Sequence, residues 1–171
     1  MNIRIAMAEC AQSFTEARNG TRESANKKAK IFCDEIKKLL PKHDSDGILL
    51  KSGLGMGSFA DVPWVAILHD KFGGSASNGY FVVFLFSKDS KRVYLTLGVG
   101  AGSAISGTWK SSFRAITEAK AEKLRSQCQV LENSGFTLSN DINLATTGWR
   151  ASSYAAGTSV YKVYETDRLP D

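Results

Sequence analysis

Hydrophobic residues in the first forty positions recur at the spacing of amphipathic helices. A first pattern covers roughly 3 to 18 and is followed by Asn19-Gly20, a pair typical of helix ends. A second covers roughly 22 to 40, where apolar residues recur at three- and four-residue steps until Pro41. The chain is therefore predicted to begin with two helices, the second of which has a lysine-rich outer face.

The middle of the chain changes to short apolar runs of the kind that form β-strands. Four runs are strand-like: 48–52, 63–69, 80–87 and 92–99. The run 80–87 is rich in aromatic and β-branched residues, and 92–99 alternates apolar and polar residues for part of its length. The link between the last two runs is short and polar, so we expect these strands to pair as an antiparallel hairpin. A final strand is expected over 159–165.

A third helix is predicted over roughly 109 to 132. Its expected core contacts are Phe113, Ile116, Leu124, Cys128 and Leu131. Helices around paired strands, without an internal repeat, indicate an α+β fold: a single domain with a curved, mainly antiparallel sheet flanked by helices. We expect this domain to span 1–165. The polar, proline-containing residues 166–171 are expected to begin a linker to an effector domain.

Composition narrows the class of protein without deciding its partner. The chain has 171 residues, 43% apolar and 23% charged, as ordinary globular domains do. It has no run of about 18 apolar residues and no convincing signal peptide, so we expect a cytoplasmic location and no membrane partner. The net charge of +5 is compatible with a polyanionic partner. Three widely separated cysteines, Cys10, Cys33 and Cys128, are expected to be buried free thiols.

The glycine-rich stretch KSGLGMGSFADVPW, residues 51–64, raises the question of a phosphate-binding loop. A P-loop requires a lysine after its last glycine, and none follows Gly57. A dinucleotide fingerprint requires a helix after the loop, whereas Pro63 and an apolar run follow here. Nucleotide binding is therefore disfavoured, and no cofactor is expected.

The residue types that carry catalysis are present but scattered. His43 and His69 lie outside any HExxH or Cys/His cluster, so no metal site is expected. No GxSxG motif occurs. The carboxylates Asp61, Asp70 and Asp89 do not form the acidic-plus-lysine pattern of a metal-dependent nuclease. We expect no catalytic residue, and a binding domain rather than an enzyme.

The segment 51–98 resembles the N-terminal DNA-recognition domain of McrB, the specificity subunit of a methylcytosine-dependent restriction endonuclease. The motifs that carry the resemblance occur in the family's order: Gly55-Met56-Gly57-Ser58-Phe59, Pro63-Trp64, Asn78-Gly79-Tyr80-Phe81, Lys88-Asp89 and Val93-Tyr94-Leu95-Thr96-Leu97. One departure is Gly98, where many relatives carry Asn. The resemblance implies a domain that reads a modified cytosine by flipping it out of the duplex.

The resemblance also implies roles for individual residues. Trp64 and Phe81, or its neighbour Tyr80, match the aromatic residues of the family's base pocket. Neighbouring strand residues point to opposite faces, so Tyr80 and Phe81 cannot both line one pocket, and both stay candidates. Leu85 matches an apolar pocket wall. Met56 matches the residue that fills the gap left in the duplex.

The resemblance also implies partners for the domain, and alternatives to this interpretation stay open. Phosphate contacts are expected from five basic residues near the predicted loops: Lys51, Lys88, Lys91, Arg92 and Lys110. The expected partners are double-stranded DNA that contains 5-methylcytosine or a related modification, and the nuclease domain or subunit of a restriction system. Two alternatives stay open: a self-contained nuclease or nucleotide hydrolase, and a protein-interaction module without a DNA role.

Overall fold

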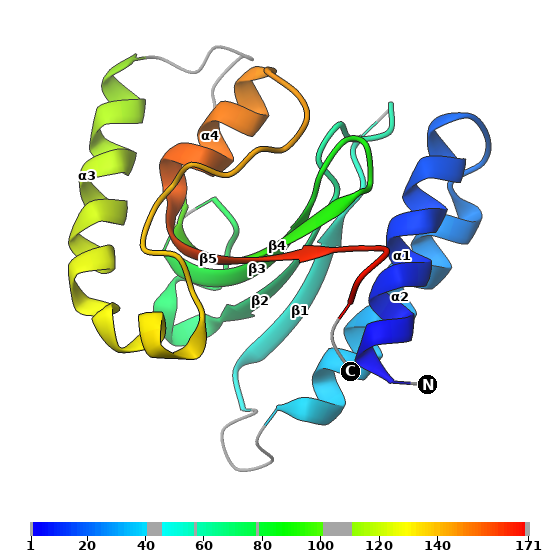
Figure 1. Cartoon of the computed structure of the whole chain (residues 1–171), viewed down its shortest axis with the longest axis horizontal. Helices are drawn as coiled ribbons and strands as arrows, with labels where there is room; N and C mark the ends of the chain where they lie inside the picture. The colour runs from blue at the N-terminus through cyan, green and yellow to red at the C-terminus, as the bar shows by residue number, and fades with distance from the viewer. Residues whose placement is uncertain (1, 41–45, 57, 78, 101–110, 170–171) are drawn as a thin grey trace.

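The computed structural model describes residues 2–40, 46–56, 58–77, 79–100 and 111–169. Five antiparallel strands form one curved sheet, in which the strands follow their order in the sequence (Figure 1). The strands are β1 (Ile48–Gly53), β2 (Trp64–His69), β3 (Tyr80–Phe86), β4 (Arg92–Val99) and β5 (Thr158–Glu165). The helices are α1 (Ile3–Arg18), α2 (Glu23–Leu39), α3 (Ser111–Gln127) and α4 (Trp149–Gly157), with short 3-10 turns at η1 (Asp70–Phe72) and η3 (Gln129–Ser134). The predicted α+β fold, with its antiparallel sheet, is confirmed.

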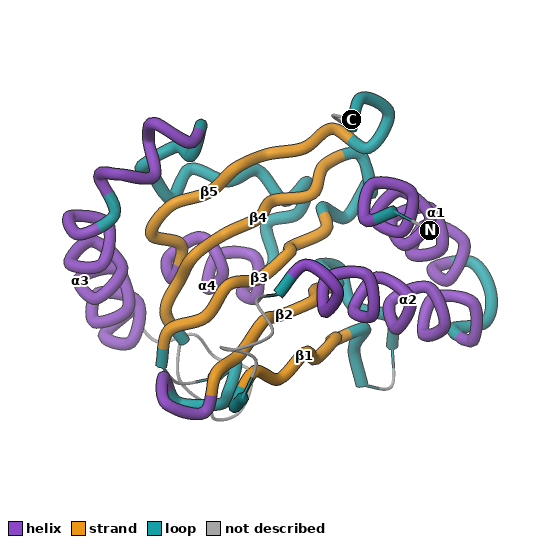
Figure 2. The backbone as a smooth tube through the Cα atoms, turned by 90° about the horizontal axis from the view of Figure 1, so that it is seen from below, coloured by secondary structure: helices purple, strands orange, loops and turns teal. Residues whose placement is uncertain are grey.

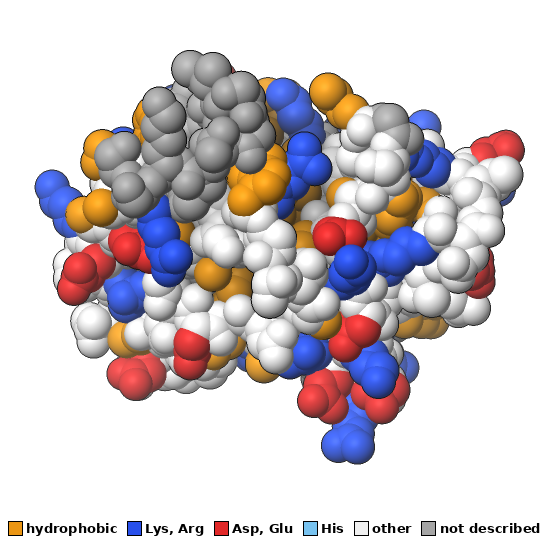
Figure 3. Space-filling model, turned by 90° about the horizontal axis from the view of Figure 1, so that it is seen from above, with side chains coloured by type: hydrophobic (Ala, Val, Ile, Leu, Met, Phe, Trp, Pro, Cys, Tyr) orange, Lys and Arg blue, Asp and Glu red, His pale blue; other side chains and the backbone are white. Residues whose placement is uncertain are grey.

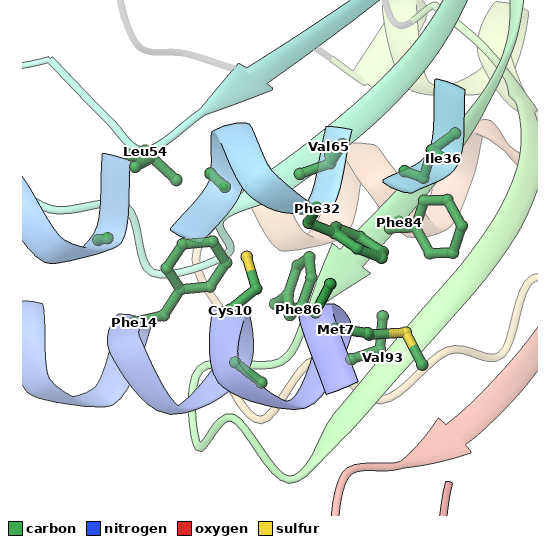
Figure 4. Close-up of a cluster of buried hydrophobic side chains, with 14 of the residues drawn as sticks. Met7, Cys10, Phe14, Phe32, Ile36, Leu54, Val65, Phe84, Phe86 and Val93 are labelled. Atoms are coloured by element: carbon green, nitrogen blue, oxygen red, sulfur yellow. The ribbon is translucent and has the colours of Figure 1, made fainter. Parts of the chain in front are cut away.

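The α1–α2 hairpin covers part of one face of the sheet (Figure 2). The apolar stripe of α2 is buried against α1 and the strands, and Phe32 is fully buried. Its ring lies edge-on to Phe84, with 5.0 Å between centroids, and Phe14 of α1 lies edge-on to Phe86 at 4.9 Å (Figure 4). These interlocked aromatic side chains exclude water and hold the two helices on the sheet.

The opposite face of the sheet carries α4 and the segment 136–148 (Figures 1 and 2). This segment is tied down by Tyr94, whose hydroxyl donates to the Asn143 carbonyl at 3.1 Å and accepts from the Asn143 amide at 3.2 Å. The Lys88 amide donates a hydrogen bond to the carbonyl of Leu144, a buried residue, at 2.9 Å. The second layer is thus fixed by polar contacts as well as by packing.

Four features differ from the sequence-based expectation. Helix α3 ends at Gln127, and Phe113 and Ile116 are 44% and 55% exposed instead of being core contacts. Cys33 is only half-buried, although Cys10 and Cys128 are buried. Helix α4 was not predicted, because its buried face consists of small residues that leave no apolar pattern: Ala151, Ser153, Ala156 and Gly157.

The residues after β5 also pack on the domain. The Thr166 amide donates to the Lys91 carbonyl at 3.0 Å, and Leu169 packs against the core formed by α1 and α2. A domain boundary at 165 stays a prediction. Within the described ranges, no helix is both long and apolar enough to cross a membrane.

Candidate functional site

The glycine-rich stretch between β1 and β2, residues 54–62, forms a tight loop that we call the glycine loop. Leu54 anchors it in the core, and the Ala60 amide donates to the Leu54 carbonyl at 2.9 Å. Gly55 has φ of +95°, and a Cβ there would lie 2.7 Å from the Ala60 nitrogen, so only glycine fits this turn. Next to it, Met56 projects into solvent and is 97% exposed.

Two arginines from the α1–α2 corner hold the glycine loop in place. Arg22 donates to the Gly55 carbonyl at 3.2 Å. Arg18 donates to the Asp61 carbonyl at 3.2 Å, and its guanidinium carbon lies 5.5 Å from the centroid of the Phe59 ring. These residues were not anticipated from the sequence, where an arginine at a helix end is a common surface feature.

Arg18 also reaches the β3–β4 turn, where it donates to the Ser90 hydroxyl at 3.1 Å. Burial lowers the pKa of the Arg18 guanidinium, and the nearby carboxylates of Asp61 and Asp89 act in the opposite direction. A single side chain therefore joins the end of α1 to two loops that flank one end of the sheet.

Trp64 opens β2 and lies between two cross-strand partners, Gly53 on β1 and Leu85 on β3. A Cβ built on Gly53 would overlap the Trp64 ring, so the indole occupies the space that a side chain on β1 would need. Gly53, the first glycine of the region, is thus needed to make room for this tryptophan and not to form a turn.

Trp64 forms one end of a cavity of about 200 Å³ between the sheet and α4, which we call the α4 cavity. Its lining comes from β2, β3, β4, α4, the start of β5 and the β2–β3 connection: Trp64, Ala66, Ala76, Ser77, Phe81, Val83, Leu85, Thr96, Gly98, Val99, Ser153, Tyr154, Gly157 and Thr158. Three of the predicted pocket residues, Trp64, Phe81 and Leu85, are brought together here. Tyr80 is not among them: strand alternation places it on the opposite face of the sheet, where it is 48% exposed.

The floor of the α4 cavity is built from small side chains. Ala66, Val83 and Thr96 pair with one another across β2, β3 and β4. Trp64 lies two residues before this row along β2, and Phe81 lies two residues before it along β3, which runs in the opposite direction. The result is a depression with a large aromatic residue at each end and α4 above it.

The chemistry of the α4 cavity is that of a site for a neutral, flat group. Among the described residues that line it, none has a charged side chain. Pockets for drug-sized ligands have volumes of about 300–1,000 Å³, so this smaller cavity suits one ring better than a whole nucleotide. Aromatic ends, apolar walls and a few hydroxyl groups are the usual means of binding such a ring.

Tyr154 of α4 completes the lining opposite Trp64, and sequence reasoning missed it because α4 itself was missed. Burial raises the pKa of the Tyr154 hydroxyl. The positive charge of Arg150 and a hydrogen bond from the Trp64 indole act in the opposite direction. The tyrosine is therefore neutral at physiological pH and is positioned by the tryptophan that it faces.

The close approach of α4 to β4 depends on two glycines. A Cβ on Gly98 would lie 2.6 Å from the Gly157 carbonyl oxygen, and a Cβ on Gly157 would lie 2.6 Å from the Val99 carbonyl oxygen. Gly98 is where the sequence departs from the family pattern that it resembles. This backbone leaves no room for a side chain there, so the roof of the cavity is set by glycine packing in this chain.

Basic side chains lie on the surface near the site. Figure 3 shows Lys and Arg side chains mixed with Asp and Glu side chains on the face that carries α4 and the neighbouring loops. Lys51 is exposed on β1 as the cross-strand partner of Ala66, and Lys91 is exposed in the β3–β4 turn. Lys88 pairs with Asp61 at 3.1 Å, and Arg92 lies 3.9 Å from Asp89. Lys110 lies outside the described residues.

These ion pairs are partly exposed, and such pairs contribute only about 0–1 kcal/mol to stability. Lys88 and Arg92 can therefore exchange their carboxylate partners for phosphates at little cost. In the part of the chain that the structure describes, no group of three or more His, Cys, Asp or Glu side chains converges as a metal site would need.

Comparison with known proteins places the chain in a family. Residues 9–171, nearly the whole chain, match the family described as MrcB-like, N-terminal domain. A search of curated proteins found no match. Such a match indicates a DNA-binding module of McrB-type restriction systems. The chain therefore belongs to the MrcB-like N-terminal domain family.

Proposed function

We propose that this domain recognises a modified cytosine in duplex DNA by flipping the base into the α4 cavity. The observation that carries the proposal is the convergence of Trp64, Phe81 and Leu85 on one small, uncharged cavity. These residues come from two strands and were selected from the sequence by their match to the family's pocket. In the proposal, the aromatic side chains stack on or abut the flipped ring, and Leu85 contacts a substituent at its 5-position.

The energetics of base flipping are compatible with this lining. Extruding a base costs a few kcal/mol, and base–aromatic stacking returns about 1–3 kcal/mol per base. The cavity offers Trp64, Phe81 and Tyr154 around one ring, together with hydroxyl groups for its polar edge. A small apolar contact to a methyl group adds about 0.8 kcal/mol for each buried carbon.

The glycine loop supplies the second half of the proposed mechanism. Met56 is at an exposed tip, on a loop that Arg18 and Arg22 hold from behind. Apolar side chains of this kind enter base steps and kink the duplex. Met56 would occupy the gap that the flipped cytosine leaves, and the basic residues near the loops (Lys51, Lys88, Lys91, Arg92 and Lys110) would contact the flanking phosphates.

The domain is proposed to act as the specificity module of a modification-dependent restriction system. It would not cut DNA itself; a nuclease domain or subunit would, and residues 166–171 would lead towards that effector. Binding governed by phosphate contacts weakens steeply as salt rises, which distinguishes a DNA module from a protein-interaction module.

The test is a titration with matched duplexes that differ at a single cytosine. The purified chain is titrated with duplexes containing cytosine, 5-methylcytosine or 5-hydroxymethylcytosine, at two salt concentrations. We expect at least one modified duplex to bind more tightly than the unmodified one, and all affinities to fall with salt. Equal affinity for all three duplexes would remove the modified-base proposal. Cleavage of DNA by this chain with Mg²⁺ would favour the nuclease alternative.

A pair of neighbouring variants tests the cavity itself. Phe81→Ala removes the aromatic ring at one end of the α4 cavity. Tyr80→Ala changes the preceding residue, which lies on the opposite face of the same strand. We expect Phe81→Ala to lose the preference for the modified duplex and Tyr80→Ala to keep it. Trp64→Ala, if folded, is expected to behave like Phe81→Ala. Retention of full preference by folded Phe81→Ala and Trp64→Ala would place the base elsewhere.

A further inference from the structure

Three residues with buried hydroxyl groups line the α4 cavity, and each hydroxyl lies within hydrogen-bond distance of a backbone carbonyl. Ser153 donates to the Arg150 carbonyl at 2.7 Å, and Thr158 donates to the Tyr154 carbonyl at 2.8 Å. Thr96, in the floor, is 1% exposed and donates to the Val83 carbonyl at 3.4 Å. The three side chains come from β4, α4 and the start of β5.

A hydroxyl group has one hydrogen and two acceptor lone pairs. Since Ser153 and Thr158 use their hydrogens in short bonds to helix carbonyls, they can offer only lone pairs to a ligand. The 3.4 Å contact of Thr96 is longer than the usual 2.5–3.0 Å range, about the limit of a weak bond, so this hydroxyl can also turn towards a ligand. Of these three buried hydroxyl groups, those of Ser153 and Thr158 are therefore arranged as acceptors. The half-buried residues Ser77 and Tyr154, which also carry hydroxyl groups, line the cavity as well.

We infer that these hydroxyl groups determine specificity by accepting hydrogen bonds from an exocyclic amino group on the flipped base. The inference rests on the proposed function and adds the chemical feature that the pocket reads. Cytosine and its 5-substituted derivatives carry such an amino group on the 4-position, where thymine carries a carbonyl oxygen. An acceptor facing an acceptor leaves both unpaired in a buried site, which disfavours thymine.

Thymine is a sharp comparison because it has the same 5-methyl group and a similar ring to 5-methylcytosine. A T·G mismatch also opens more readily than a paired base, so the cost of flipping is lower. If stacking and methyl contact alone decided binding, a T·G duplex would bind at least as tightly as a 5-methylcytosine·G duplex. Acceptor hydroxyls predict the reverse order.

The experiment measures dissociation constants of the wild-type chain for three duplexes: C·G, 5-methylcytosine·G and T·G at the same position. We expect the T·G duplex to bind about 5-fold or more weakly than the 5-methylcytosine duplex. Equal binding of the cytosine and 5-methylcytosine duplexes, together with equal binding of the 5-hydroxymethylcytosine duplex in the titration above, would defeat the proposed function. A preference for 5-methylcytosine over cytosine, combined with equal or tighter binding of T·G, would overturn this inference alone.

Two variants with matched controls assign the effect to particular hydroxyls. Ser153→Ala is compared with Ser13→Ala, because Ser13 is also buried and donates to a carbonyl three residues back at 2.7 Å, but lies in α1. Thr96→Val is compared with Thr117→Val, whose hydroxyl is buried and bonded within α3.

We expect Ser153→Ala to reduce the discrimination between 5-methylcytosine and T·G duplexes by about 3- to 10-fold, and Thr96→Val, whose hydroxyl is held less firmly, to reduce it by a smaller factor. Ser13→Ala and Thr117→Val should leave it unchanged. Folding of each variant is checked by circular dichroism and thermal unfolding. Unchanged discrimination in both folded cavity variants would overturn the assignment of these residues, and the wild-type comparison still decides the inference if a variant does not fold.

Discussion

The Trp64 indole lies over Gly53, its cross-strand partner, in the space that a Cβ on β1 would fill. This relationship connects the first glycine of the glycine-rich stretch to the α4 cavity. The glycine lets a large ring lie across the neighbouring strand, where the ring forms one end of the cavity.

Gly53→Ala is therefore expected to displace the Trp64 ring. Overpacking of this kind costs about 1–3 kcal/mol of stability, and the modified-base preference should fall with it. Chemical denaturation followed by tryptophan fluorescence measures the loss of stability, and the duplex titration measures the loss of preference for the modified base. The control is Gly20→Ala, since a Cβ there would meet only the Glu16 carbonyl at an ordinary 3.5 Å. Normal stability and normal preference in Gly53→Ala would contradict the packing described.

Arg18→Met tests the connection between α1 and the two loops that it joins. The variant loses the hydrogen bonds to Asp61 and Ser90, so we expect a loss of about 1–3 kcal/mol in the free energy of unfolding and weaker DNA binding. Arg114→Met is the comparison, because Arg114 makes an exposed pair with Glu118 on α3. If both variants were equally stable, Arg18 would have no bracing role.

Met56→Ala separates DNA binding from stability. With 97% of its surface exposed, Met56 contributes little to packing, so the free energy of unfolding should not change. Loss of an apolar wedge is expected to weaken binding to a modified duplex several-fold, about the effect of 1 kcal/mol. Fluorescence of 2-aminopurine beside the target base reports unstacking directly. The exposed Val130, replaced by alanine, is the control; identical behaviour of the two variants would exclude the wedge.

The Asp89 carboxyl in the β3–β4 turn makes the stability of the protein depend on pH. Burial raises the pKa of this carboxyl, but hydrogen bonds from the Ser87 hydroxyl and the Lys91 amide, with the charge of Arg92, outweigh it and lower the pKa below its ordinary value of 3.8. A lowered pKa in the folded state means that the carboxylate stabilises the protein above pH 3.8, and that this contribution is lost as the pH falls through the folded-state pKa.

The measurement is urea denaturation of the wild type and Asp89→Asn over a pH series. The wild type is expected to be more stable at neutral pH, and the difference should shrink below the ordinary pKa of 3.8. The size is modest because the Asp89 side chain is 34% exposed. If the difference in stability between the wild type and Asp89→Asn stayed constant down to pH 2, it would come from the amide group of the variant and not from the charge of Asp89.

The sequence by itself determined the helices whose apolar residues recur at a clear spacing and the strands that are joined by a short turn. The α1–α2 pair follows from apolar residues at helical spacing, and the β3–β4 hairpin from two strand-like apolar runs joined by a short polar turn. Trp64, Phe81 and Leu85 could be selected only through the resemblance to the McrB family pattern. Tyr80 and Phe81 could not be separated until the register of β3 assigned each to a face.

Only the tertiary structure decided the roof and the bracing of the site. Helix α4 buries small residues, so its packing comes from the close approach of Gly98 and Gly157 and leaves no hydrophobic period to detect. Tyr154 and Ser153 enter the cavity with that helix, and Arg18 acquires its role from loops more than forty residues away. Such contacts depend on backbone approach and long-range hydrogen bonds, which local sequence patterns do not encode.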